Sequence, residues 1–367
     1  MKKRILFLAQ HFITLYSFRR ELIERLCREG HEVYLSIPDS EDNVYFEKLG
    51  CRIVPTSVDR RGTDPVKDLK LILFYRAMVQ KLDPDVIFSY TIKPNIYGAL
   101  ATNGRKRRNG KPYRLVCNIT GTGETFLKNS PVSRLCRVLY RHSVRHCYKV
   151  YFQNTHDRDM FIRSGMVGDN WEMLPGSGVN LEQFTPAPMP EGEGVSFIFI
   201  GRVMRLKGIE EFVAAAEMTR AKHPETRFYI AGFVEEEEYR RRLEESDAVI
   251  PLGFQKNISE WIARCHCTIL PSHGGEGVPN VLLESAASGR ICIGSRTPGT
   301  EDVIDEGVTG YLFEAGNAED LAAAVEKVIA MTPEERAAMG AAGRAKVEKE
   351  FDREIVIGKY MEEVDRA

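Results

Sequence analysis

The chain has 367 residues, of which 43% are hydrophobic and 28% are charged, and this balance excludes a disordered or fibrous protein. At about 100–200 residues per domain, the length predicts two domains or three. No stretch approaches the ~18 consecutive apolar residues of a transmembrane helix, and the run Ile5–Ala9 is too short for a secretory signal. Eight cysteines without framework spacing indicate reduced thiols and a cytoplasmic location.

The net charge of −1 hides an asymmetry between the two halves of the chain. Residues 1–185 carry a net charge of +11, and residues 186–367 carry −12. This split predicts two domains with different partners, the first of them basic enough to favour phosphates or an anionic surface.

Short apolar runs alternate with helical patterns in the first half, and the same alternation restarts near residue 195. Continuous Val/Ile/Leu/Phe runs separated by helices predict βαβ units and parallel sheets. The predicted strands are residues 3–9, 31–38, 85–90, 195–203, 227–233, 267–272 and 290–295, and the predicted helices include residues 17–30 and 64–84.

A Pro/Gly-rich passage from Pro175 to Gly194 shows no regular spacing of apolar residues, which predicts a linker. We therefore expect one domain over residues 1–185 and a second over residues 186–352. The final segment, residues 353–367, has a helical pattern and is expected to pack back on the first domain.

The strongest chemical motif is the segment from His273 to Glu284, directly after a predicted strand. Its glycines allow backbone N–H groups to approach a ligand closely, and Pro279 suits the first position of the helix that follows. A helix N-terminus at the carboxyl end of a parallel strand is where phosphates bind in open α/β sheets. Glu276 in the loop and Glu284 in the helix suit hydrogen bonds to the hydroxyls of a sugar and of a ribose.

The second motif is the turn from Gly201 to Gly208, between a predicted strand and a predicted helix. It carries Arg202, Arg205 and Lys207, and cations on such a turn can neutralise a diphosphate, arginine in a bidentate way and lysine as a point charge.

Together, the Glu-x7-Glu pair and the cationic turn resemble the retaining nucleotide-sugar glycosyltransferases of family 4. The blocks at residues 89–101, 118–126, 150–161 and 174–184 are similar to bacterial members that extend polyprenyl-diphosphate-linked sugars for capsule, O-antigen or glycan assembly. The resemblance implies an α/β protein with the GT-B fold, in which two Rossmann-like domains with parallel sheets face each other across a cleft. It also implies a hexosyl transfer from a nucleotide sugar, expected to be UDP-linked and for example an N-acetylhexosamine.

The resemblance assigns catalytic roles to three residues. Arg202 and Lys207 would hold the donor diphosphate, and Glu276 would stabilise the oxocarbenium-like transition state. Family members work without a bound metal, so neither a metal nor another cofactor is expected. The remaining donor-binding residues would be Gly201, Arg205, Phe254, His273, Gly274, Gly275, Gly277, Val278, Pro279, Asn280 and Glu284.

The acceptor would be bound by the first domain, in loops that follow its strands. Lys93 is expected to contact an acceptor phosphate, and Thr122 stands where many relatives have an aliphatic residue. The acceptor-binding residues would be Gln10, His11 and Tyr16 in the first strand-to-helix loop, Lys93, and the loop Thr120, Gly121, Thr122 and Gly123. His11 and Lys93 are also compatible with ordinary solvated or backbone-bonded side chains.

Cys265-His266-Cys267 has no second Cys/His pair at zinc-finger spacing, so a metal site is not predicted. The basic run Arg105–Arg108 lacks interleaved aromatics, so nucleic acid is not a predicted partner. The rival functions are a non-hydrolysing sugar-nucleotide epimerase and a non-catalytic lipid- or polysaccharide-binding descendant, although the four residues Arg202, Lys207, Glu276 and Glu284 are all present.

The basic first half also predicts a membrane-associated enzyme. If residues 132–149 are helical, Arg134, Arg137, Arg141 and Arg145 form one basic stripe. Leu135, Val138 and Leu139 lie nearby and would face either the sheet or lipid headgroups. A lipid-linked acceptor favours peripheral attachment to the anionic inner face of the cell membrane.

Overall fold

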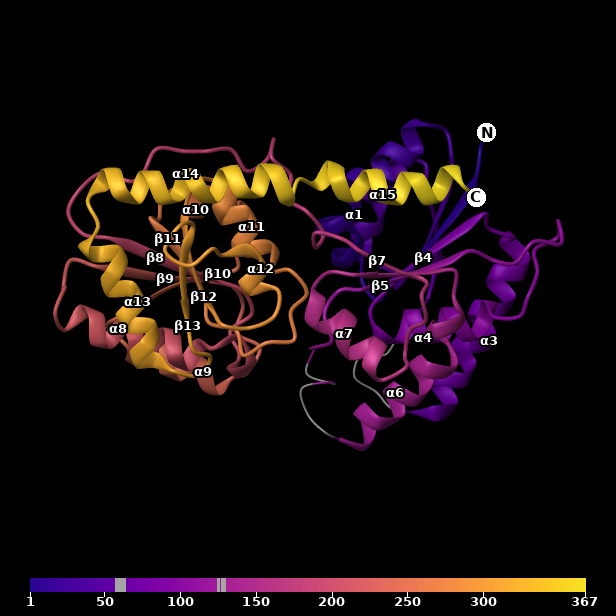
Figure 1. Cartoon of the computed structure of the whole chain (residues 1–367), viewed down its shortest axis with the longest axis horizontal. Helices are drawn as coiled ribbons and strands as arrows, with labels where there is room; N and C mark the ends of the chain where they lie inside the picture. The colour runs from indigo at the N-terminus through magenta and orange to yellow at the C-terminus, as the bar shows by residue number, and fades with distance from the viewer. Residues whose placement is uncertain (57–63, 124–125, 127–129) are drawn as a thin grey trace. The chain divides into compact units, whose positions relative to one another are not determined.

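The computed structural model describes residues 1–56, 64–123, 126 and 130–367, and it divides the chain into two compact units (Figure 1). The first unit consists of residues Met1–Ser177 and Glu354–Ala367, and the second of Gly178–Arg353. The predicted boundary at residues 185 and 186 lies inside the second unit, because Val179 and Phe184 are buried in that unit's core.

The first unit is a parallel sheet covered by helices on both faces. In the described residues its seven strands have the order β3-β2-β1-β4-β5-β6-β7. The strands are β1 (Arg4–Leu8), β2 (Glu32–Ile37), β3 (Arg52–Pro55), β4 (Val86–Tyr90), β5 (Leu115–Ile119), β6 (Lys149–Phe152) and β7 (Trp171–Met173).

Alternate strand residues face opposite helical layers, as a parallel sheet buried on both faces requires. On one face Ile87 and Leu115 pack against α3, α4, α6 and α7, and on the other Phe7 and Phe88 pack against α1, α2 and α15. The helices are α1 (Phe12–Arg28), α2 (Val44–Lys48), α3 (Pro65–Leu82), α4 (Ile92–Thr102), α6 (Pro131–His142), α7 (Thr155–Arg163) and α15 (Arg353–Asp365).

The C-terminal helix α15 is part of the first unit. Tyr360 on α15 is 1% exposed and packs against the rings of Phe88 at 4.9 Å and Tyr151 at 5.5 Å. Asn118 at the end of β5 donates a hydrogen bond from Nδ2 to Tyr360 Oη (2.5 Å). Lys149 Nζ pairs with the buried Glu363 at 2.6 Å. A segment more than 170 residues away in sequence therefore completes this core.

The second unit is a six-stranded parallel sheet in the order β10-β9-β8-β11-β12-β13 over the residues that the structure describes. Its strands are β8 (Ser196–Ile200), β9 (Arg227–Ala231), β10 (Ile250–Gly253), β11 (Cys267–Leu270), β12 (Ile291–Ser295) and β13 (Gly310–Phe313). Its helices are α8 (Ile209–Arg220), α9 (Glu238–Glu245), α10 (Ile258–Ala263), α11 (Asn280–Ala287), α12 (Thr300–Val303), α13 (Ala318–Ala330) and α14 (Pro333–Glu350), with a 3₁₀ turn at Arg205–Lys207 before α8.

One buried arginine ties the start of the second unit to its sheet. Arg290, 1% exposed, donates to the carbonyl oxygens of Ala187 and Pro188 at 2.8 Å and of Ala263 at 2.9 Å. Because the guanidinium satisfies these carbonyls inside the protein, the Pro-rich segment packs on the unit without regular structure of its own. No helix of the described residues is both long enough and apolar enough to cross a membrane.

Candidate active site

Both predicted donor motifs lie at one point of the second sheet. Two hydrogen-bonded neighbours, β8 and β11, lie at the middle of this parallel sheet. The chain adds β9 and β10 on the outer side of β8, and β12 and β13 on the outer side of β11, so the order of the strands reverses between β8 and β11. Ligands of open α/β sheets bind outside the carboxyl ends of strands at such a switch point. The turn Gly201–Gly208 follows β8, and the loop Pro271–Pro279 follows β11. The fold therefore brings together two motifs that are about 70 residues apart in the chain.

Gly208 sets how closely these two segments approach. It has a positive φ of 73°, and a Cβ there would lie 1.9 Å from the carbonyl oxygen of Pro271. Only glycine fits this contact without displacing backbone. His273 N also donates to Leu206 O at 2.9 Å, so the turn and the loop are joined by backbone as well.

Lys207 and Glu276 meet across this junction. Lys207 Nζ forms an ion pair and hydrogen bond with Glu276 Oε1, and Ser272 Oγ donates to the same oxygen at 3.1 Å. The two charged side chains are 18% and 23% exposed, so they lie at the mouth of the site rather than in the core. The cation and the carboxylate assigned to diphosphate and sugar are thus in direct contact.

Arg202 also has a carboxylate partner, which the sequence analysis did not identify. Its Nη1 lies 2.5 Å from Glu235 Oε2, in the segment after β9. Arg205 is more exposed, at 73% of its side chain; its backbone N donates to Glu236 at 2.8 Å, and its guanidinium is 4.0 Å from Glu210. Glu235 and Glu236 therefore both contact the cationic turn. The sequence could have indicated this contact, because the acidic run that begins at Glu235 lies close to the end of a predicted strand.

Two glycines of the loop after β11 adopt a backbone conformation that favours glycine, in line with the predicted Gly-rich loop. Gly274 and Gly275 have positive φ angles of 110° and 77°. His273 is held by Glu211 in the first turn of α8, with Nε2 and Oε1 3.0 Å apart. Glu211 is a second residue that the sequence analysis missed, although it lies only four residues after Lys207, at the start of the helix that follows the cationic turn.

Helix α11 begins one residue later than expected, with Pro279 as its N-cap and Asn280 as its first residue, and no side chain caps it. Glu284 lies in its second turn and is half-buried. Burial raises the pKa of Glu284 from 4.5 to about 7, and the charge of Arg353 partly opposes the shift. Val278 is buried and Gly277 lies in the same loop, so these two contribute backbone to the site.

Phe254 lies directly after β10 and is 66% exposed. A second exposed ring, Phe233 after β9, lies 6.5 Å from it, centroid to centroid. Phe233 O accepts from Val203 N at 3.0 Å, so this aromatic pair adjoins the cationic turn. Two exposed rings beside a cationic turn are suited to stacking on a nucleobase.

The predicted acceptor residues gather at the equivalent edge of the first sheet, whose order reverses between β1 and β4. Gln10 and His11 follow β1; Gln10 is buried, and the exposed His11 is the N-cap of α1. Tyr16 was expected in the loop, but α1 already begins at Phe12, so Tyr16 lies in the helix. Its ring packs on Phe12 at 5.1 Å, because the aromatic face of the first helical turns is drawn into the core.

Lys93 lies in the first turn of α4, at the same edge, and its Nζ pairs with Asp68 of α3 at 2.8 Å. The loop Thr120, Gly121, Thr122 and Gly123 follows β5. Thr122 is buried and its Oγ1 donates to Asp157 at 3.3 Å; burial raises the pKa of this carboxyl. Asp157 is a further residue that the sequence analysis did not single out, while Glu124 and Thr125 of the predicted block lie outside the described residues.

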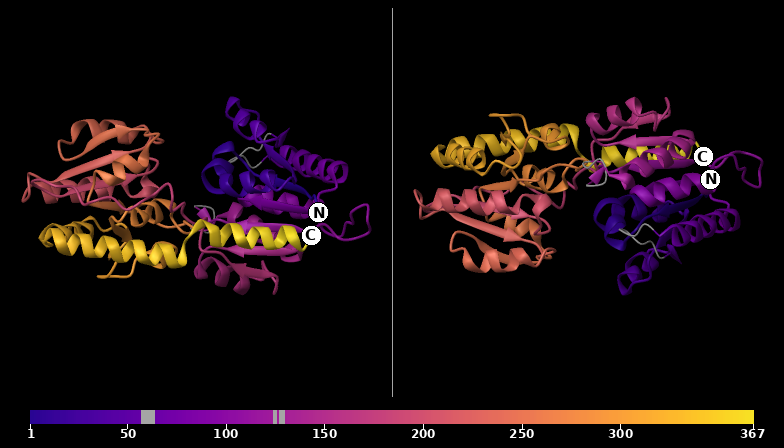
Figure 2. Two further views of the ribbon diagram at one scale, coloured as in Figure 1. Left: turned by 90° about the horizontal axis from the view of Figure 1, so that it is seen from above. Right: turned by 90° about the horizontal axis from the view of Figure 1, so that it is seen from below.

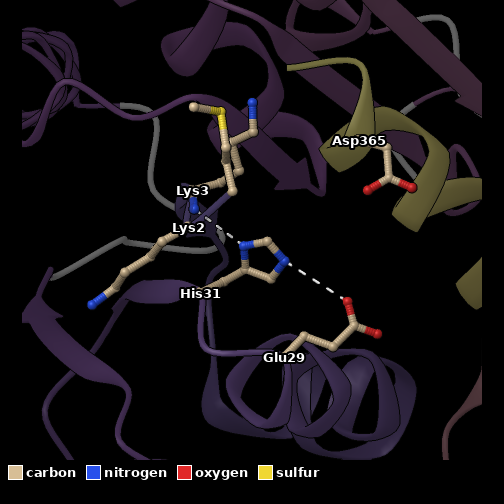
Figure 3. Close-up of a pocket in the computed structure, with 6 residues that line it drawn as sticks. Lys2, Lys3, Glu29, His31 and Asp365 are labelled. Carbon is tan, nitrogen blue, oxygen red and sulfur yellow. Dashed lines mark hydrogen bonds and ion pairs between the residues drawn. The ribbon is translucent and has the colours of Figure 1, made fainter.

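A surface pocket lies at the opposite, amino-terminal edge of the first sheet (Figure 3). It is lined by Lys2, Lys3, Glu29 and His31, with Asp365 of α15 at its rim. His31 Nδ1 accepts from Lys3 N at 3.2 Å. Parallel sheets bind ligands at their carboxyl edges, so this pocket does not belong to the candidate site.

The Cys265-His266-Cys267 run is part of the core at the start of β11. Ser196 N donates to His266 Nδ1 at 3.1 Å, and burial lowers the pKa of His266 to about 4, so the ring is neutral. Within the described residues, no three His, Cys, Asp or Glu side chains are grouped as metal ligands would be.

Comparison with known proteins identifies the family. A model described as "Glycosyl transferase 4-like domain" matches residues 17–176, and one described as "Glycosyl transferases group 1" matches residues 194–331. The chain belongs to the family 4 glycosyltransferases, which have the GT-B fold. The first match spans β2 to β7 of the first unit and the second spans the whole sheet of the second unit, and the predicted family and fold class are confirmed.

Two relatives that match most of this glycosyltransferase are named for sugars linked to undecaprenol through a diphosphate. N,N'-diacetylbacillosaminyl-diphospho-undecaprenol alpha-1,3-N-acetylgalactosaminyltransferase of Campylobacter jejuni is 26% identical, over 99% of this chain and 98% of the relative. UDP-Gal:alpha-D-GlcNAc-diphosphoundecaprenol alpha-1,3-galactosyltransferase of Escherichia coli is 23% identical, over 83% and 79%. Among solved structures, Anabaena HepE in complex with UDP-glucose has a TM-score of 0.80 at 17% identity over the whole of both chains, which shows the fold.

Proposed function

We propose that this glycosyltransferase moves a hexosyl residue from a UDP-sugar to a saccharide carried on polyprenyl diphosphate. The sugar is an N-acetylhexosamine, its anomeric configuration is retained, and no metal takes part. The observation that carries the proposal is the junction of Lys207 and Glu276 at the switch point of the second sheet.

The chemistry follows from the charges at this junction. The bond between the anomeric carbon and the β-phosphate oxygen breaks, and negative charge grows on the departing UDP. Lys207 and Arg202 offset that charge, in the role that a metal ion has in other transferases. The uncapped N-terminus of α11 adds positive charge from its backbone N–H groups.

Glu276 accepts hydrogen bonds from sugar hydroxyls and stabilises the positive charge that develops at the anomeric carbon. The acceptor hydroxyl attacks from the face that the phosphate leaves, and its proton passes to the departing phosphate oxygen, so the configuration is retained. Glu284 holds the ribose, and Phe254 with Phe233 contacts the base.

The acceptor is assigned to the first unit on the basis of its polar loops at the carboxyl edge. The names of the C. jejuni and E. coli relatives, which both specify undecaprenol-linked diphosphates, support a polyprenyl-diphosphate acceptor. Because such an acceptor resides in a bilayer, we place the enzyme at the inner face of the cell membrane as a peripheral protein.

One experiment tests the reaction class. The purified protein is incubated with UDP-N-acetylglucosamine, UDP-N-acetylgalactosamine, UDP-glucose or UDP-galactose and a synthetic prenyl-diphosphate-linked sugar, with and without EDTA. We expect an acceptor-dependent disaccharide whose new linkage has the donor's anomeric configuration by NMR, at a rate that EDTA leaves unchanged. An inverted linkage or loss of activity with EDTA overturns the mechanism. Epimerised UDP-sugar formed without acceptor favours the epimerase instead.

A further inference from the structure

Large apolar side chains are exposed along one side of α3. Val66, Leu69 and Leu73 are 62%, 57% and 52% exposed. Their spacing of three and four residues places them in one stripe on the helix surface. The opposite side of α3 carries Leu71 and Tyr75, which are buried against the sheet. The exposed stripe is therefore not the face that holds the helix in the fold.

Helix α6 repeats this arrangement. Val132, Leu135 and Val138 are 43%, 57% and 50% exposed and recur every third residue. Tyr140 is buried in the core under the helix, and Leu139 is half-buried and packs against the same core.

The arginines of this region do not form the single stripe that was expected. The helix ends at His142, so Arg145 lies in a separate 3₁₀ turn. Arg137 is half-buried with its guanidinium 5.8 Å from the Phe126 ring. Arg134 and Arg141 are exposed on the helix.

The two helices lie on the same face of the sheet with α4 beside them (Figures 1 and 2). The first turns of α3 and α4 meet, since Asp68 of α3 pairs with Lys93 of α4 at 2.8 Å, and Cys136 in the first half of α6 packs against the same core cluster. Lys93 directly follows the carboxyl end of β4. The exposed apolar side chains of both helices therefore begin at the edge of the sheet that carries the predicted acceptor residues.

Cations flank the apolar side chains. Lys67 and Lys70 are exposed on α3, and Arg134 and Arg141 on α6. The sequence has no acidic residue between positions 125 and 156, and Asp68 is already paired with Lys93. Apolar side chains bordered by cations match the boundary between acyl chains and anionic headgroups of a bilayer.

We propose that the outward surfaces of α3 and α6 form a docking face that inserts Val66, Leu69, Leu73, Val132, Leu135 and Val138 into an anionic lipid surface. This inference rests on the proposed function and specifies the membrane partner. Docking by this face presents the acceptor edge of the first unit to the bilayer. A diphosphate at the membrane surface then reaches the loops after β1, β4 and β5 while its polyprenyl tail stays in lipid.

The test compares Leu69→Glu/Leu135→Glu with Val44→Glu, a matched exposed apolar position on α2 on the opposite face of the sheet. Flotation with phosphatidylglycerol-containing and pure phosphatidylcholine vesicles is measured at low and high salt. We expect wild type and Val44→Glu to bind the anionic vesicles, and binding to weaken as salt screens the cations. The double variant loses about tenfold or more in partitioning. If its thermal midpoint falls, Leu73→Ser/Val138→Ser takes its place.

Transfer assays separate this inference from the proposed function. On a long polyprenyl acceptor in vesicles, we expect kcat/KM of the double variant to fall about tenfold, while a short-chain acceptor in solution is used at the wild-type rate. The proposed docking face is overturned if wild type does not bind anionic vesicles, or if the double variant binds them as well as wild type does. A dimer in sedimentation that only the double variant lacks also overturns it, since the face then binds a second copy. If neither acceptor is used, the proposed function fails, and flotation still decides the docking face.

Discussion

Lys207 and Glu276 form an ion pair across the two loops that follow β8 and β11. Their contact depends on the close approach of Gly208 to Pro271, which leaves no room for a side chain. A donor diphosphate would compete with Glu276 for Lys207. In the proposed function, Lys207 would exchange Glu276 for the phosphate and Glu276 would turn to the sugar, so donor binding and the arrangement of this carboxylate would be coupled.

Replacing Glu276 should affect turnover more than donor binding. In the proposed mechanism this carboxylate stabilises charge that develops in the transition state, so Glu276→Ala should lower kcat by about 100-fold or more and change the UDP-sugar Kd only a few-fold. Steady-state kinetics and calorimetry measure the two. Glu319→Ala, an exposed carboxylate on α13, is the matched control. Turnover of Glu276→Ala within a few-fold of wild type would exclude the assigned role.

Replacing Lys207 should weaken binding of the diphosphate and spare the nucleoside. A charge-assisted hydrogen bond to phosphate contributes about 1.5–3 kcal/mol, so Lys207→Ala should raise the Kd of UDP by about 10–100-fold. The Kd of uridine should stay within about twofold. Lys222→Ala, just past the other end of α8, controls for loss of a lysine. Equal losses for UDP and uridine in calorimetry would move Lys207 away from the phosphates.

Glu235 should oppose donor binding, because it occupies Arg202 in the absence of phosphate. Both side chains are partly exposed, and such pairs contribute about 0.2–1 kcal/mol. Glu235→Gln should therefore tighten UDP binding by up to about fivefold. Glu237→Gln, which removes a nearby carboxylate paired with Arg240, should leave the Kd unchanged. Weaker UDP binding by Glu235→Gln would contradict this competition.

The pKa of Glu284 predicts how stability changes with pH. Burial raises this pKa from 4.5 to about 7, so the folded protein keeps a proton that the unfolded chain releases. The contribution of Glu284 to the free energy of unfolding is therefore full below pH 4.5, is lost as pH rises through about 7, and is flat above about pH 8. At 1.36 kcal/mol for each unit of pKa, the loss is about 3 kcal/mol.

Urea unfolding of wild type and Glu284→Gln at pH 5, 6, 7 and 8 measures this contribution. We expect wild type to lose most of its stability relative to the variant between pH 5 and 7, with only a small further change from pH 7 to 8. A difference that does not change with pH would mean that Glu284 is ionised throughout. UDP binding should tighten over the same range, since the ionised carboxylate is the better acceptor for ribose hydroxyls.

Tyr360 should contribute strongly to the stability of the first unit. It is buried among Phe88, Tyr90 and Tyr151 and accepts the hydrogen bond from Asn118. Tyr360→Ala should lower the free energy of unfolding by about 3–5 kcal/mol, and Tyr360→Phe, which keeps the ring, by about 1 kcal/mol. Denaturant unfolding checks both. Loss of less than 1 kcal/mol in Tyr360→Ala would mean that α15 is not part of this core.

The sequence by itself determined the repeated strand–helix alternation, the parallel sheets and the placing of the Gly201–Gly208 turn and the His273–Glu284 segment at strand ends. These features are local: a buried strand needs a continuous apolar run, and a turn that approaches a ligand needs glycine. Local pattern was less exact at helix ends, where α1 extends back to Phe12 and α6 stops at His142.

The tertiary structure alone decided which distant side chains meet. The order of strands puts β8 beside β11, and that neighbourhood, not the spacing along the chain, pairs Lys207 with Glu276. The same holds for Arg202 with Glu235 and for Tyr360 with Asn118. In the unfolded chain, each cationic side chain can approach several carboxylates. Ion pairs and ring contacts act over only a few ångströms, so the packing of the sheets decides which partner each side chain meets.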